Sequence, residues 1–209
     1  MKKILITSFM IFGVVCLSVI YGRQSGKTDR TLSETSLSRT YSNDYFSIQY
    51  PYSYLADASF NCKPASMEEL RDMEADSITA MPMNELNIVP NGPNHNWDMP
   101  EVYVVLSRHK LDFPIRMFMD LSIYSKNQEN SDNMPYIGCS DVDSISFAGF
   151  PALAIDFAYK GEQGDTLIQH QIIVQKPNYE LYYINSKYNL SNVQAYELGN
   201  KIIDTFKFK

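Results

Sequence analysis

The chain has few of the residue patterns on which familiar active sites depend. Its 209 residues include only three histidines, His95, His109 and His170, and three cysteines. No histidine belongs to a metal-ligand pair at helical spacing or lies near a cysteine pair. A Gly-x-Ser-x-Gly segment, which positions the nucleophile of many serine hydrolases, is absent as well. We therefore expect a protein that is not an enzyme, and we assign no catalytic residue, cofactor or metal ligand.

A cluster of basic residues is also missing. Lysine and arginine together number 18 against 24 aspartates and glutamates, so the formal net charge is −6. Domains that bind nucleic acid or adhere to anionic lipid present a concentrated positive patch. We therefore expect no nucleic acid among the partners of this acidic chain.

Long apolar runs are absent except at the N-terminus. Lys2 and Lys3 precede residues 4–20, a run of about seventeen mostly apolar residues. This order predicts a signal peptide or an N-terminal membrane anchor over residues 1–21, and an exported protein of the cell envelope, in the periplasm or attached to the membrane. Three forms stay open: a cleaved signal, a lipoprotein anchored at Cys16, and a retained membrane helix.

The next segment is too polar to fold by itself. Residues 22–40 are mainly Ser, Thr, Gly and charged residues, with only Leu32 and Leu37 to bury. Such a composition predicts a flexible linker, because little apolar burial offsets the entropy lost on ordering. Residues 41–209 then form a single globular domain, of a size ordinary for one hydrophobic core.

Several segments of this domain have the alternation of apolar and polar residues that is typical of strands. This alternation predicts a half-buried strand at residues 46–50 and further strands at 117–123 and 153–159. Residues 166–175 and 179–185 predict a hairpin, because Lys-Pro-Asn between them favours a turn. Residues 102–106 are apolar at every position, which predicts a central strand.

Two helices are expected around this sheet. Ser191 and Gln194 form a capping box ahead of Ala195 and Leu198, and Ser66 with Glu69 forms another. Small residues alternate with large ones in 153–159, so a helix can approach that face of the strand closely. Together these patterns predict an α+β fold, an antiparallel sheet with helices packed on its faces.

Three segments carry a resemblance to a known group of proteins. Tyr-Ser-Asn-Asp-Tyr-Phe-Ser-Ile-Gln-Tyr-Pro at 41–51 resembles the opening strand of the PsbP-like superfamily, which includes DcrB-type envelope lipoproteins. Ser-Phe-Ala-Gly-Phe-Pro-Ala at 146–152 resembles a later turn, and Asp-Thr-Phe-Lys-Phe at 204–208 resembles the closing helix-to-strand segment. The resemblance implies an α-β-α sandwich, and a protein that binds other proteins rather than catalyses a reaction.

Residues 81–100 are predicted to form a long irregular loop, because they contain four prolines. The loop carries Trp97, the single tryptophan of the chain, beside His95, Asp98 and Met99. An aromatic anchor with polar neighbours is typical of a protein-contact surface, so we expect these four residues to contact an envelope protein partner. The alternative is that Trp97 packs back onto the sheet.

Cys62 and Cys139 are the two cysteines outside the N-terminal segment. In an oxidising compartment they are a candidate disulfide, whereas two separate buried thiols are the alternative. His170 shares an apolar strand face with Ile168 and Ile172, where we expect a hydrogen-bonded histidine of the sheet face.

The sequence favours an exported, non-catalytic protein-binding or accessory module. The alternatives are a lipid-handling protein, a metal-handling protein that uses Met and His ligands, and a hydrolase with a site built from loops.

A short triplet recurs three times in the chain. Asp76-Ser77-Ile78, Asp143-Ser144-Ile145 and Asp165-Thr166-Leu167 share the pattern Asp, then Ser or Thr, then an apolar residue. The pattern resembles the O-glycosylation acceptor motif of Bacteroides-type bacteria.

Overall fold

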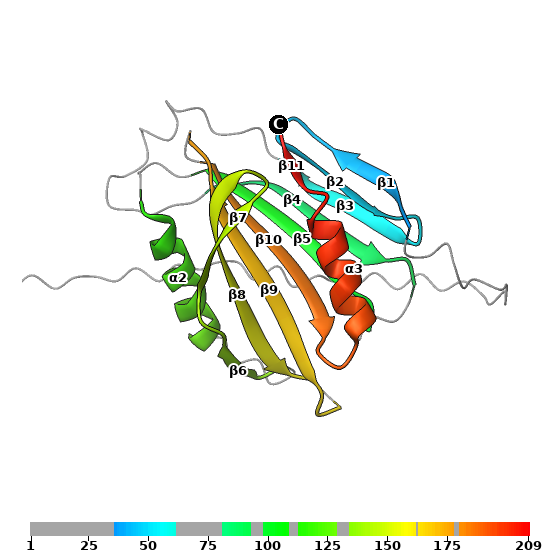
Figure 1. Ribbon diagram of the computed structural model, residues 1–209, viewed down its shortest axis with the longest axis vertical. Helices are drawn as coiled ribbons and strands as arrows, with labels where there is room; N and C mark the ends of the chain where they lie inside the picture. Colours follow the sequence, from blue (N-terminus) through cyan, green and yellow to red (C-terminus); the bar gives the residue numbers. More distant parts are fainter. Residues whose placement is uncertain are drawn as a thin grey trace, which may run out of the picture.

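The computed structural model describes residues 36–61, 81–92, 98–108, 113–128, 134–161, 163–177 and 180–209. These residues form two antiparallel sheets and two helices, labelled in Figure 1. The large sheet has eight strands in the order β3-β4-β5-β10-β9-β8-β6, with β7 pairing with β8 at the same edge as β6. Its strands are β3 Tyr54–Asn61, β4 Met81–Pro90, β5 Glu101–Arg108, β6 Tyr136–Cys139, β7 Asp143–Phe147, β8 Phe150–Lys160, β9 Thr166–Gln175 and β10 Glu180–Asn189.

The small sheet brings together the two ends of the described chain. Its order is β1-β2-β11, with β1 at Leu37–Ser42, β2 at Phe46–Pro51 and β11 at Lys207–Phe208. The side chain of Thr205 ties this sheet to the preceding helix, because its hydroxyl accepts the Gln49 amide at 2.8 Å and donates to the Ile202 carbonyl at 2.7 Å.

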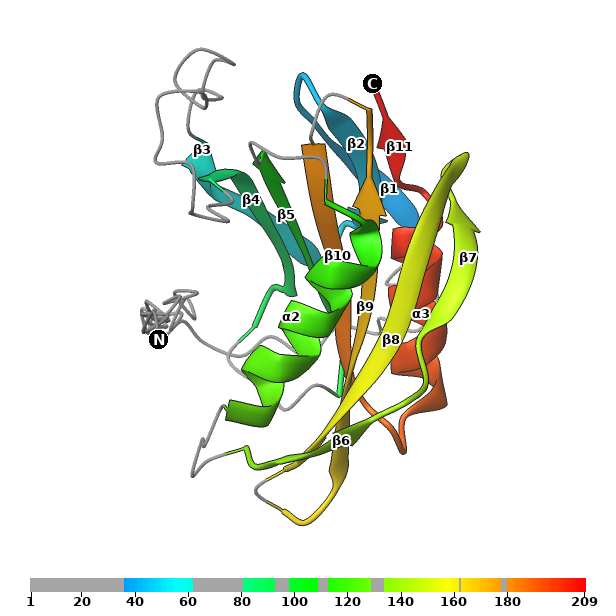
Figure 2. The same cartoon turned by 90° about the vertical axis from the view of Figure 1, so that its left-hand side faces the viewer.

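The helices lie on opposite faces of the large sheet, as Figures 1 and 2 show together. Helix α3, Val193–Ile203, packs on β10 and β5, beside the small sheet. Helix α2, Ile115–Gln128, packs on β9 and β8 from the other side. The structure therefore confirms the predicted α+β fold, with helices on both faces of an antiparallel sheet.

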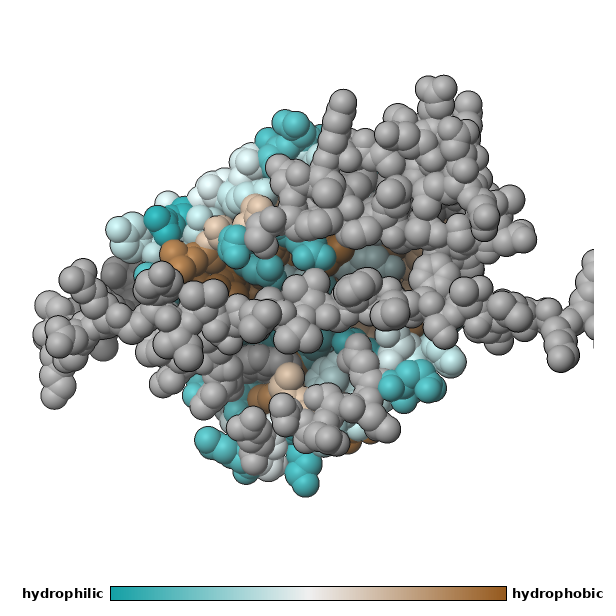
Figure 3. Space-filling view, turned by 180° about the vertical axis from the view of Figure 1, so that it is seen from behind, coloured by the Kyte–Doolittle hydropathy of each residue, from teal (hydrophilic) through white to brown (hydrophobic). Residues whose placement is uncertain are grey.

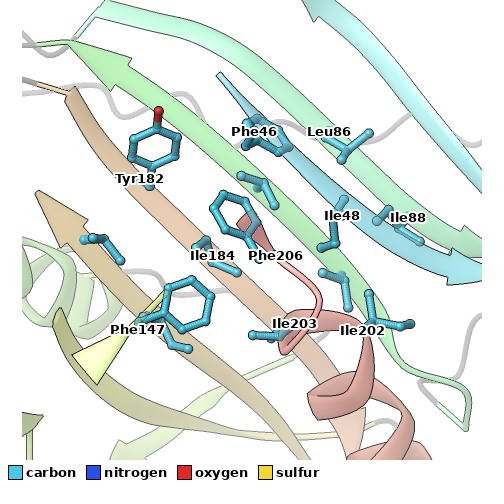
Figure 4. Close-up of a cluster of buried hydrophobic side chains, with 14 of the residues drawn as sticks. Phe46, Ile48, Leu86, Ile88, Phe147, Tyr182, Ile184, Ile202, Ile203 and Phe206 are labelled. Carbon is cyan, nitrogen blue, oxygen red and sulfur yellow. The ribbon is translucent and has the colours of Figure 1, made fainter. Parts of the chain in front are cut away.

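The main core fills the space between the large sheet, α3 and the small sheet (Figure 4). Phe206, just after α3, stacks on Phe46 of β2 with ring centroids 5.1 Å apart. Fully or almost fully buried members of this core include Ile48, Leu86, Ile88, Val102, Val104, Leu106, Tyr182, Ile184, Ile202 and Ile203. Burial of this apolar area, on both sides of central strands, is the main force that holds the layers together.

Strand β8 separates two cores through its alternating side chains, as its sequence predicts. Leu153, Ile155 and Phe157 pack with Phe118 and Met119 of α2 in a second core. On the opposite face, the alanines of β8 lie toward α3 and the main core. Helix α3 nevertheless makes its main contacts with β10, β5 and β2 and not with β8, so the close helix approach expected at these alanines is not seen there.

The predicted strand at 117–123 is wrong, because these residues belong to α2. Phe118 and Met119 are both buried. In a strand with one buried face, neighbouring side chains point to opposite faces, so only one of these two residues would be buried. Leu121, expected on the buried side with Met119, is 40% exposed. The helical contact of Arg116 with Asp120, four residues on and 2.8 Å away, fits the same conclusion.

The irregular loop predicted for residues 81–100 is also wrong in its first half, where β4 forms an interior strand between β3 and β5. Pro82 lies at an irregularity in the pairing with β5, and Pro90 is the last residue of the strand. Proline is tolerated at these places because no regular ladder hydrogen bond requires its missing N–H. Leu86 and Ile88 supply the buried face.

Two boundaries differ from expectation. Strand β1 starts at Leu37, so residues 37–40, assigned to the linker, pair with β2. Helix α3 is capped by Asn192, one residue after the expected Ser191. The hairpin of residues 166–185 and the interior position of 102–106 are confirmed. The predicted helix that starts near Ser66 lies outside the described residues.

Candidate protein-contact surface

The start of α3 is held by a series of polar contacts. The Leu190 amide donates to the Thr166 carbonyl at 2.9 Å, and the Asn189 side chain accepts the Ser191 amide at 3.1 Å. Asn192 then caps the helix, since its Oδ1 accepts the Ala195 amide at 3.1 Å. The same side chain donates from Nδ2 to the carbonyl oxygen of Asp98 at 2.6 Å. One residue therefore fixes both the start of the helix and the segment that leads into β5.

Large apolar side chains gather around this rigid helix start. Leu190 is 57% exposed, Val193 63% and Tyr196 46%, and Met99, which follows Asp98, is 38% exposed. We call these four residues the α3 surface. Several exposed apolar side chains at one place are unusual for a monomer and are typical of a contact site.

Tyr196 is positioned by a second aromatic ring. Its ring centroid lies 5.4 Å from that of Tyr188 on β10, in a tilted arrangement. Burial raises the pKa of the Tyr188 hydroxyl above its ordinary value, with smaller contributions from the nearby Asp156 carboxylate and Tyr196. Tyr188 therefore stays neutral near pH 7 and serves as a fixed support for the exposed ring.

The structure places part of the predicted contact site on this surface. Asp98 and Met99 are exposed beside the cap of α3, whereas His95 and Trp97 lie outside the described residues. The sequence interpretation missed Leu190, Val193 and Tyr196. A helical projection would have found two of them, since Val193 and Tyr196 lie three residues apart, off the buried stripe of Ala195, Leu198 and Ile202.

One carboxylate–histidine pair lies near the α3 surface. Asp156, His170 and Ser186 are register partners on β8, β9 and β10, and His170 Nδ1 lies 2.6 Å from Asp156 Oδ1. This confirms His170 as a hydrogen-bonded histidine of the sheet face. Ser186 Oγ is fully buried without a hydrogen-bond partner, directly beneath Gly199 of α3. In this arrangement the hydroxyl is out of reach of a substrate, so the row does not act as a catalytic triad.

A buried group of carboxamides occupies the opposite face of the sheet. Gln169 Nε2 donates to Asn185 Oδ1 at 2.9 Å, and both residues are almost fully buried. Asn185 Nδ2 and Gln171 Nε2 have no hydrogen-bond partner. Figure 3 shows the side of the molecule away from α3, where hydrophilic and hydrophobic residues of the described part lie side by side. Within that part, no group of three or more His, Cys, Asp or Glu side chains is arranged to hold a metal ion.

Two further sequence predictions involve residues outside the described part of the chain. Cys139 lies exposed at the end of β6, and its expected partner Cys62 lies outside the described residues, so the disulfide stays a prediction. The segment 1–21 is likewise outside them. Among the helices that the structure describes, none has the length and apolar character to cross a membrane.

Comparisons with known proteins identify the fold. A scan against models of protein families finds no match, and a search of curated proteins finds none either. Among solved structures, cyanobacterial PsbP (CyanoP) from Synechocystis matches with a TM-score of 0.51 at 9% identity, over 88% of this chain and 98% of that one. LpqN of Mycobacterium tuberculosis, described as involved in cell envelope biogenesis, matches with a TM-score of 0.46 at 12% identity, over 78% and 83% of the two chains.

A Pseudomonas aeruginosa protein of unknown function also matches, with a TM-score of 0.36 at 12% identity, over 74% of this chain and 85% of that one. At such low identity a structural match bears on the fold alone, and CyanoP is the match of these three that supports it. The predicted resemblance is thereby confirmed: the chain has a PsbP-like fold.

Proposed function

We propose that this chain is an exported, non-catalytic envelope protein that binds another protein through the α3 surface. The observation that carries the proposal is the exposure of Leu190, Val193 and Tyr196, between 46% and 63%, around the start of one helix. Export is supported by the order of Lys2, Lys3 and the apolar residues 4–20.

The α3 surface has a fixed backbone conformation, which favours binding. Its backbone is held by the contacts of Asn189 and Asn192, so little conformational entropy is lost when a partner docks. Tyr196 presents a large ring with few rotatable bonds, which suits an anchor at the centre of an interface. His95 and Trp97 directly precede the Asp98–Met99 segment in sequence, and we include them in the proposed contact.

A pair of matched variants tests this proposal. The first changes Val193→Glu and Tyr196→Ala on α3. The second changes Leu121→Glu and Tyr124→Ala on α2, where the two residues are 40% and 65% exposed on the opposite side of the sheet. Each tagged full-length protein is produced in the organism of origin, cross-linked in intact cells and purified.

We expect the α3 variant to lose the cross-linked protein that the parent and the α2 variant both retain. Thermal melts should stay within a few degrees of the parent, because exposed side chains contribute little to stability. Retention of the cross-linked protein by the α3 variant, or its equal loss from both variants, would contradict the proposed surface.

A further inference from the structure

The three Asp-Ser/Thr-apolar triplets have different surroundings in the folded protein. The triplet at Ser77 lies outside the described residues, and the other two can be compared directly. A hydroxyl that is modified by a transferase must be exposed, and the transferase must be able to contact the backbone around it. Only one of these two triplets meets both requirements.

Ser144 lies on β7, at an edge of the large sheet. Asp143 and Ser144 are both exposed, whereas Ile145 is half-buried against the main core. Because neighbouring side chains of a strand point to opposite sides, the core contact of Ile145 directs Ser144 outward. Within the described residues β7 pairs only with β8, so its other backbone edge is open. The segment is therefore already extended and accessible along one side.

Thr166 is enclosed by comparison. It starts the interior strand β9, is half-buried, and its carbonyl accepts the Leu190 amide at 2.9 Å. The Asp165 carboxylate accepts the Asn189 side-chain amide at 2.6 Å, and the Asp165 carbonyl accepts the Gly161 amide at 2.9 Å. Reaching this triplet would require breaking the turn that supports α3.

We infer that Ser144 is an O-glycosylation site, modified outside the cytoplasm by a transferase that uses a lipid-diphosphate-linked sugar. Ser144 Oγ attacks the anomeric carbon of the donor, and a new O–C1 bond forms. The bond between C1 and the phosphate oxygen breaks, the lipid diphosphate leaves with the electron pair, and the serine proton passes to a base of the transferase. The inference rests on the export part of the proposed function and does not depend on the α3 surface.

Mass spectrometry of the protein from its own organism tests the site. The full-length tagged protein is recovered from cells. Export is measured separately: after the outer layer is permeabilised, exported protein is digested by an added protease. Peptides that contain Ser144 and Thr166 are then analysed in the parent and in Ser144→Ala, Ser144→Thr and Thr166→Ala.

We expect a carbohydrate mass on the Ser144 peptide of the exported parent and of Thr166→Ala. Ser144→Ala should lose the mass completely, and Ser144→Thr should keep it because the threonine hydroxyl preserves the triplet. An unmodified Ser144 peptide in exported protein would overturn the inference and leave export intact, whereas protein retained in the cytoplasm would overturn both. Equal modification of Thr166 would also refute the structural selection of Ser144.

Discussion

The side chain of Asn192 joins the start of α3 to the backbone of Asp98, 94 residues away in sequence, through a hydrogen bond of 2.6 Å. The same side chain accepts the Ala195 amide and so caps the helix. The α3 surface therefore has two parts, one on the helix and one before β5, whose positions depend on a single amide group.

Two substitutions at Asn192 separate these roles. Asn192→Ala removes both the cap and the bond to Asp98, and should lower the free energy of unfolding by about 1–2 kcal/mol. Asn192→Asp keeps an acceptor for the Ala195 amide and places a negative charge at the helix N-terminus, so it should be the more stable of the two. Urea denaturation measures both. Equal losses would show that the cap contributes little.

Gly199 and Ser186 should be coupled energetically. A Cβ at position 199 would collide with Ser186 Oγ and lie 3.3 Å from Pro100 Cβ, so Gly199→Ala forces the buried hydroxyl to move. The crowding should cost about 1–3 kcal/mol, offset by up to about 1 kcal/mol of helix propensity. Ser186→Ala removes a hydroxyl that has no partner and should be nearly neutral. The double variant should recover part of the loss in a thermal melt; a strictly additive result would rule out the proposed contact.

The helical conformation of α2 predicts that nearby side chains contribute very differently to stability. Phe118→Ala should lower the free energy of unfolding by about 3–5 kcal/mol, because the ring is 2% exposed in the second core. Leu121→Ala removes a side chain that is 40% exposed, and should cost less than about 1 kcal/mol. Denaturant unfolding of the two variants distinguishes the helix from the strand first expected here, in which Leu121 and not Phe118 would lie beside Met119.

The hairpin between β7 and β8 contains a residue under backbone strain. Ala148 and Gly149 both have positive φ, at 47° and 87°, between the paired residues Phe147 and Phe150. Two-residue turns of this kind favour Asn followed by Gly, because Asn tolerates the left-handed region better than Ala. Ala148→Asn should raise the melting temperature by about 2–4 °C, for a gain of about 1 kcal/mol. Ala148→Val, which is β-branched, should lower it.

The sequence predicted correctly the strands that have a clear local residue pattern. It was wrong where a strand-like alternation occurs within a helix. Strand 46–50 was found because its buried residues alternate with more exposed ones, strand 153–159 because large apolar residues alternate with mostly small ones, and strand 166–175 because a turn signal follows it. The resulting fold class is confirmed. In 117–123 an alternation of apolar and polar residues occurs by coincidence within a helix, as the adjacent burial of Phe118 and Met119 shows.

The residues of the proposed contact surface could be singled out from the sequence only in part, because they come from distant segments. The sequence singled out Asp98 and Met99 as expected contact residues because of their aromatic and polar neighbours, and this stays a prediction. Their proximity to the start of α3 depends on the long-range bond from Asn192, and no local pattern encodes such a bond. The exposed apolar residues of α3 were missed because the helical spacing of Ala195, Leu198 and Ile202 identifies only the buried face of the helix.

Strand β1 determines where the domain must be cut. A fragment of residues 36–209 retains Leu37, which packs on the main core, and Arg39, whose Nη1 donates to the Tyr54 carbonyl at 3.1 Å and whose guanidinium lies 4.9 Å from the Tyr52 ring centroid. A fragment of residues 41–209 loses these contacts and most of the pairing with β2.

We expect both fragments to unfold cooperatively, with the longer one more stable by about 2 kcal/mol, the value of a few lost hydrogen bonds and one partly buried leucine. Urea denaturation followed by tyrosine fluorescence and circular dichroism measures the difference. Equal midpoints would restore the boundary at residue 41, and a broad transition in both fragments would show that residues before 36 are needed for folding.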